Sequence, residues 1–327
     1  MGRRNADMKV VSPIYITRSD IGWYSCNANA YRKPLEVVSR GNATLCVDRR
    51  CRVPQEIADK ASGIVRFDGL LGLLGLDVSF EGTDVEVFTG FDFPCMFKAW
   101  KLKRKLGCRW TVFLWDPPCL SYRDAFPPIR WTVDALFRFF AKRCDRLVLN
   151  IHPGLLNEIG YVPRDGQLEL RMQDAFEGVD FNCGKEDVDS EWDFGVLANW
   201  SKAKGGDLVE RALRALPGRR CLWIGESPDN RQRRQIEFAG HLPQEEAFAK
   251  LRKCRVLVVP YLPTRALKWN YPLKLFEYLS IGRPIIASDN PGNVSVANRY
   301  TGRITLFKSG DADDMVAKAR DLIGPDS

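Results

Sequence analysis

The stretch that decides the fold is NYPLKLFEYLSIGRPIIASDNPG, residues 270–292. Pro272 favours a helix start, because proline has no N–H to leave unpaired there, and the apolar run 284–288 after the helix predicts a buried strand. The free N–H groups and the positive dipole end of such a helix start suit an anionic group such as a diphosphate. Lys274, in the first turn, adds a positive charge. This stretch therefore predicts an anion-binding helix in a parallel α/β sheet.

Glu277 lies further along the same helix. A carboxylate at this depth is a usual way to hold a ribose through both of its hydroxyls, and the alternative is a carboxylate in solvent. Phe276 and Leu279 flank Glu277, and a buried strand follows the helix. These apolar neighbours indicate that the Glu277 side chain does not simply extend into solvent.

Strand and helix patterns alternate outward from this stretch, which is typical of a parallel sheet covered by helices. The expected strands are 8–18, 43–48, 85–92, 110–116, 146–150, 194–199, 221–225, 235–240, 256–260, 284–288 and 303–307. The expected helices are 27–38, 95–106, 130–143, 206–216, 245–254, 273–281 and 312–323. The fold class predicted from this order is α/β, with two Rossmann-like doubly wound domains.

The domain boundary follows from length and from a loss of periodicity. A chain of 327 residues has room for two domains of ordinary size. Residues 177–193 are rich in Gly and acidic residues, so we expect the linker there, between an N-terminal domain at 1–180 and a C-terminal domain at 194–327. A packing of the last helix back toward the N-terminal domain is left open. Ligands of such sheets bind at the carboxyl ends of strands, so the expected active site is the cleft between the domains.

Charge and cysteine usage indicate partners and compartment. Residues 1–150 carry 24 Lys and Arg against 16 Asp and Glu, whereas residues 151–327 carry 25 of each. The net charge of +8 thus lies in the first half, which we expect to meet any acidic ligand or surface. The first residues lack a secretory signal, no apolar run is long enough to span a membrane, and ten scattered cysteines suit reduced thiols. The expected location is the cytoplasm.

The residues quoted above belong to a wider resemblance. The run P-x-K-x-x-E-Y-L-x-x-G-R-P-I-I-A-S-D resembles the donor-binding helix of GT-B glycosyltransferases, particularly the retaining family 4, also called group 1. Residues 199–205 are similar to the basic loop of that family, and residues 222–228 are similar to its strand that ends in Gly. Residues 238–261 are similar to its block of a helix followed by a strand that ends in Pro. These pieces occur in the order that the family requires and cover nearly all of 194–292. The resemblance implies a GT-B fold and transfer of a sugar from a nucleotide sugar.

The resemblance also implies roles for individual residues. The implied donor-binding residues are Lys202, Lys204, Gly225, Gly240, His241, Leu242, Tyr271, Pro272, Leu273, Lys274 and Glu277. In this scheme Glu277 holds the ribose, the turn 240–242 touches the nucleobase, and the lysines hold the diphosphate together with the amides of 271–273. Lys204 and Lys274 are catalytic candidates, because negative charge grows on the departing nucleotide diphosphate. Cations and a helix N-terminus can stabilise this negative charge, so neither a metal ion nor another cofactor is expected.

One position departs from the family pattern. The signature usually has two Glu separated by seven residues, and Trp269 stands where the first is expected. That first Glu normally contacts the transferred sugar, so its replacement leaves the donor sugar and the retaining outcome open. Trp269 either stacks on a sugar ring or forms a wall of the cleft.

The N-terminal half matches the family only in arrangement, as expected for a domain that binds the variable acceptor. The acceptor-side candidates, each just beyond an expected strand, are Gly22, Trp23, Asp92, Asp116 and His152. Asp116 is also the expected catalytic or acceptor-orienting residue, with an ordinary loop residue as the alternative. His152 fits a loop or a helix start better than a general base.

Basic and aromatic residues gather in two helical stretches, 97–110 and 128–143. Helices of this kind lie on anionic lipid headgroups, which would suit a lipid-linked acceptor at the inner face of a membrane. The alternative is a solvated helix face that turns Trp100 and Leu102 to the core.

The expected function is metal-independent, retaining transfer of a sugar from a nucleotide-diphosphate sugar to a glycan or lipid-linked acceptor, as in glycan biosynthesis. The main alternative is a catalytically silent GT-B subunit that binds a nucleotide or a partner. A nucleotide-sugar epimerase would need more acid–base groups than this chain offers. Nucleic acid is not an expected partner, because no nucleic-acid-binding motif is present.

Overall fold

The computed structural model describes residues 8–10, 13–21, 29–76, 78–80, 85–115, 126–172, 190–227, 229 and 233–324. The chain forms two compact units, Met1–Ala175 (unit 1) and Phe176–Ser327 (unit 2). Most of the expected linker, 177–193, lies outside the described residues.

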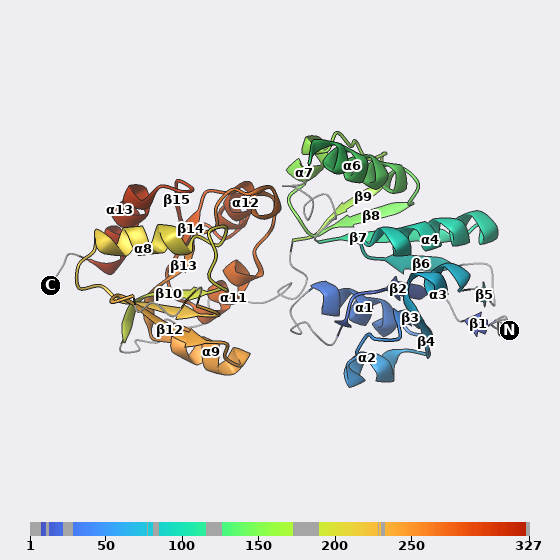
Figure 1. Cartoon of the computed structure of the whole chain (residues 1–327), viewed down its shortest axis with the longest axis horizontal. Helices are drawn as coiled ribbons and strands as arrows, with labels where there is room; N and C mark the ends of the chain where they lie inside the picture. The colour runs from blue at the N-terminus through green and yellow to red at the C-terminus, as the bar shows by residue number, and fades with distance from the viewer. Residues whose placement is uncertain are drawn as a thin grey trace. The chain divides into compact units, whose positions relative to one another are not determined.

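Unit 1 contains a parallel sheet that has seven strands within the described residues, in the order β4-β3-β2-β6-β7-β8-β9 (Figure 1). Its strands are β2 (Ile14–Thr17), β3 (Thr44–Asp48), β4 (Gly63–Phe67), β6 (Glu86–Thr89), β7 (Arg109–Leu114), β8 (Arg146–Leu149) and β9 (Leu168–Leu170). Every residue of β2 and β3 is buried, and so is every residue after the first in β6, β7 and β8. Parallel sheets are covered on both faces, and this explains why these strands read as continuous apolar runs.

The predicted strand 8–18 is two strands. β1 (Met8–Val10) pairs with β5 (Val78–Phe80) in a separate parallel ladder, and β2 begins after Pro13. Pro13 has no N–H to donate to a ladder, although its carbonyl accepts from the Thr44 backbone N–H at 2.8 Å. A proline inside an apolar run therefore divided the strand.

The helices of unit 1 are α1 (Asn29–Ser39), α2 (Gln55–Lys60), α3 (Gly69–Gly75), α4 (Phe93–Leu106), α6 (Pro127–Ala141) and α7 (Gly154–Glu158). α1, α4 and α6 lie within three residues of the predicted bounds. α2, α3 and α7 were not predicted, because helices of five to seven residues are too short to show a helical period. α4 packs against α3 and against α6, and α1 packs against α2.

Unit 2 contains a second parallel sheet with six strands among the described residues, in the order β12-β11-β10-β13-β14-β15. The strands are β10 (Trp192–Leu197), β11 (Cys221–Ile224), β12 (Ile236–Gly240), β13 (Cys254–Val259), β14 (Ile285–Ser288) and β15 (Ile304–Phe307). The helices are α8 (Gly206–Arg214), α9 (Gln244–Arg252), α10 (Arg265–Lys268), α11 (Leu273–Ile281), α12 (Pro291–Arg299) and α13 (Ala312–Ile323). α13, the last helix, packs on α8 and adds Met315, Val316 and Ala319 to the core of unit 2.

Both sheets are doubly wound, as predicted. In unit 2, β10 has β11 on one side and β13 on the other, so the chain reverses its direction of travel across the sheet at this point. In unit 1, β2 lies in the same way between β3 and β6. Ligands of open α/β sheets bind outside the carboxyl ends of the strands at such points. Each unit therefore offers one binding edge.

A helix that crosses a bilayer must be both long and apolar. Across the part of the chain that the structure describes, no helix is long and apolar enough to cross a membrane.

Candidate active site

A cavity of about 340 Å³ lies at the carboxyl ends of β10, β11 and β13 in unit 2. It is lined by Leu197, Ala198, Asn199, Lys204, Ile224, Gly225, His241, Leu242, Tyr261 and Lys274. Five of the predicted donor-binding residues are among these: Lys204, Gly225, His241, Leu242 and Lys274. They come from four separate segments of the chain, so the fold brings together what the sequence only lists in order. We call this cavity the unit 2 cavity.

Two cations reach the unit 2 cavity from different elements. Lys204 lies in the loop between β10 and α8, and its Nζ is 4.1 Å from the centroid of the Tyr261 ring. Lys274 lies in the first turn of α11, and its Nζ is 2.8 Å from Oε2 of Glu277. A cavity lined by two lysines at the start of a helix favours an anionic ligand.

Glycines let the loops at this edge pack against each other's backbone. A Cβ on Gly205 would lie 2.0 Å from the carbonyl oxygen of Pro260, and one on Gly225 would lie 2.3 Å from that of Ala198. Both glycines have positive φ, 78° and 138°. No side chain fits at either position. The close packing holds the Lys204 loop against the end of β13.

Glu277 is buried, as the sequence predicts, with 2% of its surface exposed. Despite the nearby Lys274 ammonium, its Oε2 has no hydrogen bond of ordinary geometry among the described residues. Burial raises the pKa of Tyr261 and of Tyr278, and the charge of Glu277 adds to both shifts. Both phenols are therefore neutral at pH 7. A buried carboxylate oxygen without a hydrogen bond indicates a place for a ligand hydroxyl.

The turn 240–242 borders the cavity next to β11. The Gly225 N–H donates to the Gly240 carbonyl at 2.8 Å, and Gly240 has a φ of 68°. His241 Nε2 lies 3.7 Å from Glu226 Oε1, and both side chains are exposed. Of this exposed pair, His241 lines the cavity.

The remaining predicted donor residues lie outside the lining of the unit 2 cavity. Lys202, Gly240, Glu277 and the segment 271–273 are not among its lining residues, and Pro272 is the N-cap of α11. Trp269 ends the short helix α10, and the Lys268 ammonium lies 4.4 Å from the centroid of its ring. Asn199 and Tyr261 line the cavity but were not predicted as site residues. Their signal was their position directly after strands β10 and β13.

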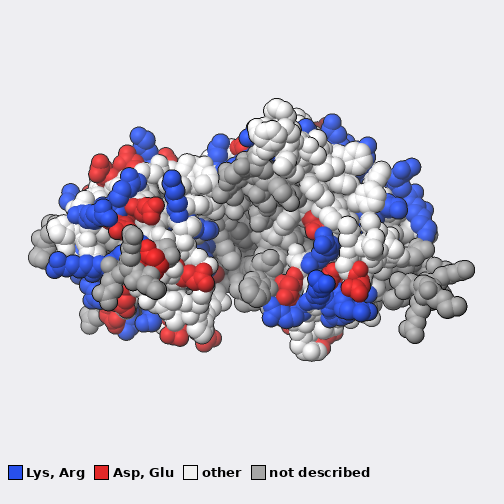
Figure 2. Space-filling view, in the orientation of Figure 1, with Lys and Arg blue, Asp and Glu red and all other residues white. Residues whose placement is uncertain are grey.

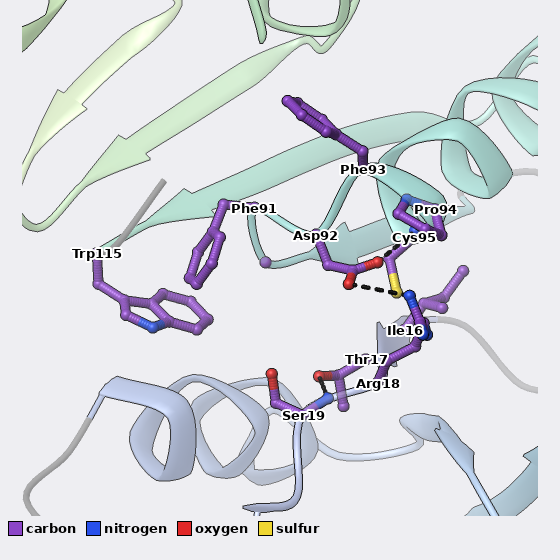
Figure 3. Close-up of a pocket in the computed structure, with 11 residues that line it drawn as sticks. Ile16, Thr17, Arg18, Ser19, Phe91, Asp92, Phe93, Pro94, Cys95 and Trp115 are labelled. Atoms are coloured by element: carbon purple, nitrogen blue, oxygen red, sulfur yellow. Dashed lines mark hydrogen bonds and ion pairs between the residues drawn. The ribbon is translucent and has the colours of Figure 1, made fainter. Parts of the chain in front are cut away.

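Unit 1 has its own cavity of about 390 Å³, at the carboxyl ends of β2, β6 and β7 (Figure 3). It is lined by Ile16, Thr17, Arg18, Ser19, Gly90, Phe91, Asp92, Phe93, Pro94, Cys95 and Trp115. We call it the unit 1 cavity. The rings of Phe91 and Trp115 meet edge to face, with 5.1 Å between their centroids. Figure 3 shows these two rings on one side of the cavity and the Arg18 and Asp92 side chains on the other.

Asp92, an acceptor-side candidate, has structural partners. Its Oδ1 accepts from the Cys95 backbone N–H at 3.1 Å and so caps α4. Its Oδ2 lies 3.4 Å from Arg18 Nη1. Arg18 and Asp92 are the charged residues among the described residues of the lining, and their charges cancel. The unit 1 cavity suits a neutral ligand with an apolar face better than an anion.

The other acceptor-side candidates lie elsewhere. Gly22, Trp23 and Asp116 fall outside the described residues. His152 does not line the unit 1 cavity, and its Nδ1 accepts from the Gly154 backbone N–H at 3.1 Å, at the start of α7. Partial burial lowers the pKa of His152, so the ring is neutral at pH 7. This placement agrees with a helix-start residue.

The C-terminal part of the chain matches a known protein family. The family model described as "Glycosyl transferases group 1" matches residues 193–324. A comparison with curated protein sequences finds no match.

Solved structures resemble nearly the whole chain. Sucrose-phosphate synthase from Thermosynechococcus elongatus has a TM-score of 0.67 and 13% identity, covering 96% of this chain and 89% of that one. Anabaena HepE in complex with UDP has a TM-score of 0.61 and 12% identity, covering 97% and 90%. The structure described as "Trehalose-6-phosphate from E. coli bound with UDP-2-fluoro glucose" has a TM-score of 0.60 and 13% identity, covering 96% and 90%. The predicted resemblance is confirmed: the chain has the GT-B fold, and its residues 193–324 match the group 1 glycosyltransferase family.

Proposed function

We propose that this glycosyltransferase moves a sugar from a nucleotide-diphosphate sugar, bound in the unit 2 cavity, to a glycan or lipid-linked acceptor. The observation that carries the proposal is the convergence of Lys204 and Lys274 on one cavity beside the buried carboxylate of Glu277. Two cations suit a diphosphate, and a buried carboxylate that lacks a hydrogen bond suits the hydroxyls of a ribose. HepE and the E. coli structure bind UDP and a UDP-sugar, which supports a donor of this class.

Sugar transfer requires the unit 2 cavity to stabilise the leaving group of the reaction. The oxygen of an acceptor hydroxyl forms a bond to the anomeric carbon, the bond from that carbon to the diphosphate oxygen breaks, and the hydroxyl proton is released. The nucleoside diphosphate leaves with one more negative charge. Lys204 and Lys274 stabilise that charge, and so does the N-terminus of α11. These groups act in place of a metal ion in our proposal. We assign the retaining outcome by resemblance to group 1.

The acceptor, in this proposal, binds in the unit 1 cavity. Phe91 and Trp115 offer aromatic surface to the apolar face of a sugar ring, and the Arg18–Asp92 pair offers donors and acceptors to its hydroxyls. Because the pair is neutral, a neutral sugar fits this lining better than a sugar phosphate. Of the two acceptor-side candidates that the structure describes, Asp92 lines this cavity and His152 does not, and Asp116 remains our candidate for orienting the acceptor hydroxyl.

A second candidate function rests on Trp269. It replaces the Glu that contacts the transferred sugar in the family signature, and it ends α10 beside Lys268. A chain that binds the nucleotide without turning it over would be a silent GT-B subunit.

The first experiment is thermal stabilisation by a panel of nucleoside diphosphates and nucleotide sugars in EDTA. A ligand at about 100 times its Kd stabilises the folded protein by about 2.7 kcal/mol, which is a shift of several degrees. We expect one nucleoside diphosphate to stabilise the wild type and to lose its effect on the Lys204→Met/Lys274→Met variant. The charge-matched control is Lys308→Met/Lys318→Met, which removes two lysines of unit 2 that do not line the cavity. Stabilisation of both variants to the wild-type extent would exclude the proposed donor site.

The second experiment separates the two candidate functions. The stabilising nucleotide sugar is incubated with the protein and a panel of neutral mono- and disaccharides, and release of the nucleoside diphosphate is measured. Release that depends on one saccharide supports sugar transfer. Binding without release on any saccharide, or on a lipid-linked sugar, supports the silent subunit.

A further inference from the structure

Helix α6 has apolar residues on both of its sides. Val133, Phe137 and Phe140 on the inner side are buried in unit 1. The outer side and the residue before the helix expose Phe126 (69%), Ile129 (49%), Trp131 (62%) and Leu136 (41%). A helix at the surface of a globular protein normally turns charged and polar residues outward. Several large apolar side chains together on one exposed helix mark an interaction surface.

The position of α6 in the fold gives this surface a direction. β7 runs to the carboxyl edge of the sheet, α6 returns from that edge, and β8 starts at the opposite edge. The exposed apolar residues occupy the first three turns of α6 and therefore lie toward the carboxyl edge. The unit 1 cavity lies at the same edge of this sheet. A partner on the outer side of α6 would thus lie close to that cavity.

Cations lie beside the apolar residues, on α4 and at the end of α6. Neighbouring α4 contains five Lys and Arg and no Asp or Glu, and it packs against α6. Lys101 and Arg104 of α4 and Lys142 at the end of α6 are exposed. None of these three has an ion pair with a carboxylate of the described residues. The carboxylate within α6 is Asp134, which is buried. The region of Figure 2 in which α6 lies is mostly white, with Lys and Arg in blue beside it.

We propose that this surface docks on an anionic lipid bilayer. It consists of Phe126, Ile129, Trp131, Leu136, Lys101, Arg104 and Lys142, and we call it the α6 face. Helices that lie in a bilayer interface combine an apolar side with Lys and Arg and with Trp at headgroup depth. Lys101, Arg104 and Lys142 form no ion pair with a carboxylate in the part of the chain that the structure describes, so they complement a surface of anionic lipids. The inference rests on the exposed residues and does not depend on the sugar-transfer reaction.

The structure changes which residues carry this interaction. The sequence pointed to both basic helices, 97–110 and 128–143. In α4, Leu102 is buried, Trp100 is half-buried against Phe139, and Arg104 lies over the Trp100 ring. The apolar part of the surface therefore belongs to α6, and α4 supplies charge.

The test is sedimentation of the full chain with vesicles of phosphatidylcholine alone and of phosphatidylcholine mixed equally with phosphatidylglycerol. We expect the wild type to sediment with the mixed vesicles, to bind the neutral vesicles at least tenfold more weakly, and to dissociate as salt is raised. Ile129→Ser/Trp131→Ser should weaken binding to the mixed vesicles by tenfold or more. Lys101→Gln/Arg104→Gln should weaken it by about tenfold and reduce its salt dependence.

The matched control is Val162→Ser/Leu170→Ser, which removes two exposed apolar side chains of unit 1 that are not part of the α6 face. It should bind as the wild type does, and circular dichroism should show that all variants are folded. Failure of the wild type to sediment with mixed vesicles would overturn the proposal. So would equal binding by the wild type and Ile129→Ser/Trp131→Ser. Sedimentation equilibrium tests the other occupant: a dimer that dissociates in Ile129→Ser/Trp131→Ser, without vesicle binding, would show that a second copy covers the α6 face.

Discussion

Glu277→Gln is the substitution that separates ligand binding from stability most cleanly. Glutamine keeps the size of the side chain and removes its charge. In our proposal the carboxylate accepts hydrogen bonds from two ribose hydroxyls. A bond to a charged group contributes about 1 kcal/mol more than a neutral one, so the variant loses roughly 2 kcal/mol of binding. This is a rise in Kd of about 30-fold.

The same substitution should leave the free protein folded and at least as stable. Glu277 is almost fully buried, and its charge is compensated by the Lys274 ammonium, whose Nζ lies 2.8 Å from Oε2. The Lys274 side chain is 30% exposed and can turn to water when its partner becomes neutral. The substitution loses the ion pair but also removes the cost of burying a carboxylate, and these two effects largely cancel when the partner can reach water. We therefore expect weaker binding without a fall in the melting temperature.

Isothermal titration calorimetry with the nucleoside diphosphate that stabilises the wild type measures the first effect, and thermal denaturation measures the second. Glu237→Gln is the control, because it neutralises a carboxylate of unit 2 that pairs with Arg220 outside the cavity lining. The reasoning is refuted if Glu277→Gln binds within threefold of the wild type. It is also refuted if the variant loses affinity only because it unfolds.

Further predictions concern the loops, the unit 1 cavity and pH. Gly205→Ala should lower the free energy of unfolding by about 2–5 kcal/mol in urea denaturation, because the new Cβ clashes with backbone and the residue has positive φ. The control Gly218→Ala has positive φ without the clash, so it should lower this free energy by only about 1 kcal/mol. Asp92→Ala should lose about 1 kcal/mol of cap stabilisation, and Asp92→Asn should keep most of it, as thermal denaturation can check. Burial acts to raise the pKa of Glu36, but Lys33, Arg171 and Arg40 outweigh it and lower the pKa below 4.5. The stability from Glu36 is thus present above pH 4.5 and lost below it, so Glu36→Gln should flatten the acid limb of stability against pH.

The fold was predictable where elements are long and periodic. The predicted helix 273–281 has the bounds of α11, because Pro272 and Gly282 mark its two ends. The short helix α3 was missed, since GLLGLLG shows neither a helical nor a strand period. The prediction of one strand at 8–18 followed the apolar run and overlooked Pro13, which favours a break in a strand.

The candidate site was predictable where residues follow a motif along the chain. Lys204, Gly225, His241 and Lys274 were named from sequence and line one cavity. The partners of Asp92 were not predictable in the same way, because Arg18 is distant in sequence and meets it only through the fold. Its role as a helix cap did have a signal, the Pro two residues later in the first turn.

The central claim is that the unit 2 cavity binds the diphosphate of a nucleotide-sugar donor. The most direct measurement is a crystal structure of the chain, grown in EDTA, with the nucleoside diphosphate that stabilises it. We predict diphosphate oxygens within hydrogen-bond distance of Nζ of Lys204 and of Lys274, and ribose hydroxyls on the carboxylate of Glu277. A nucleotide bound away from these three side chains would contradict the account.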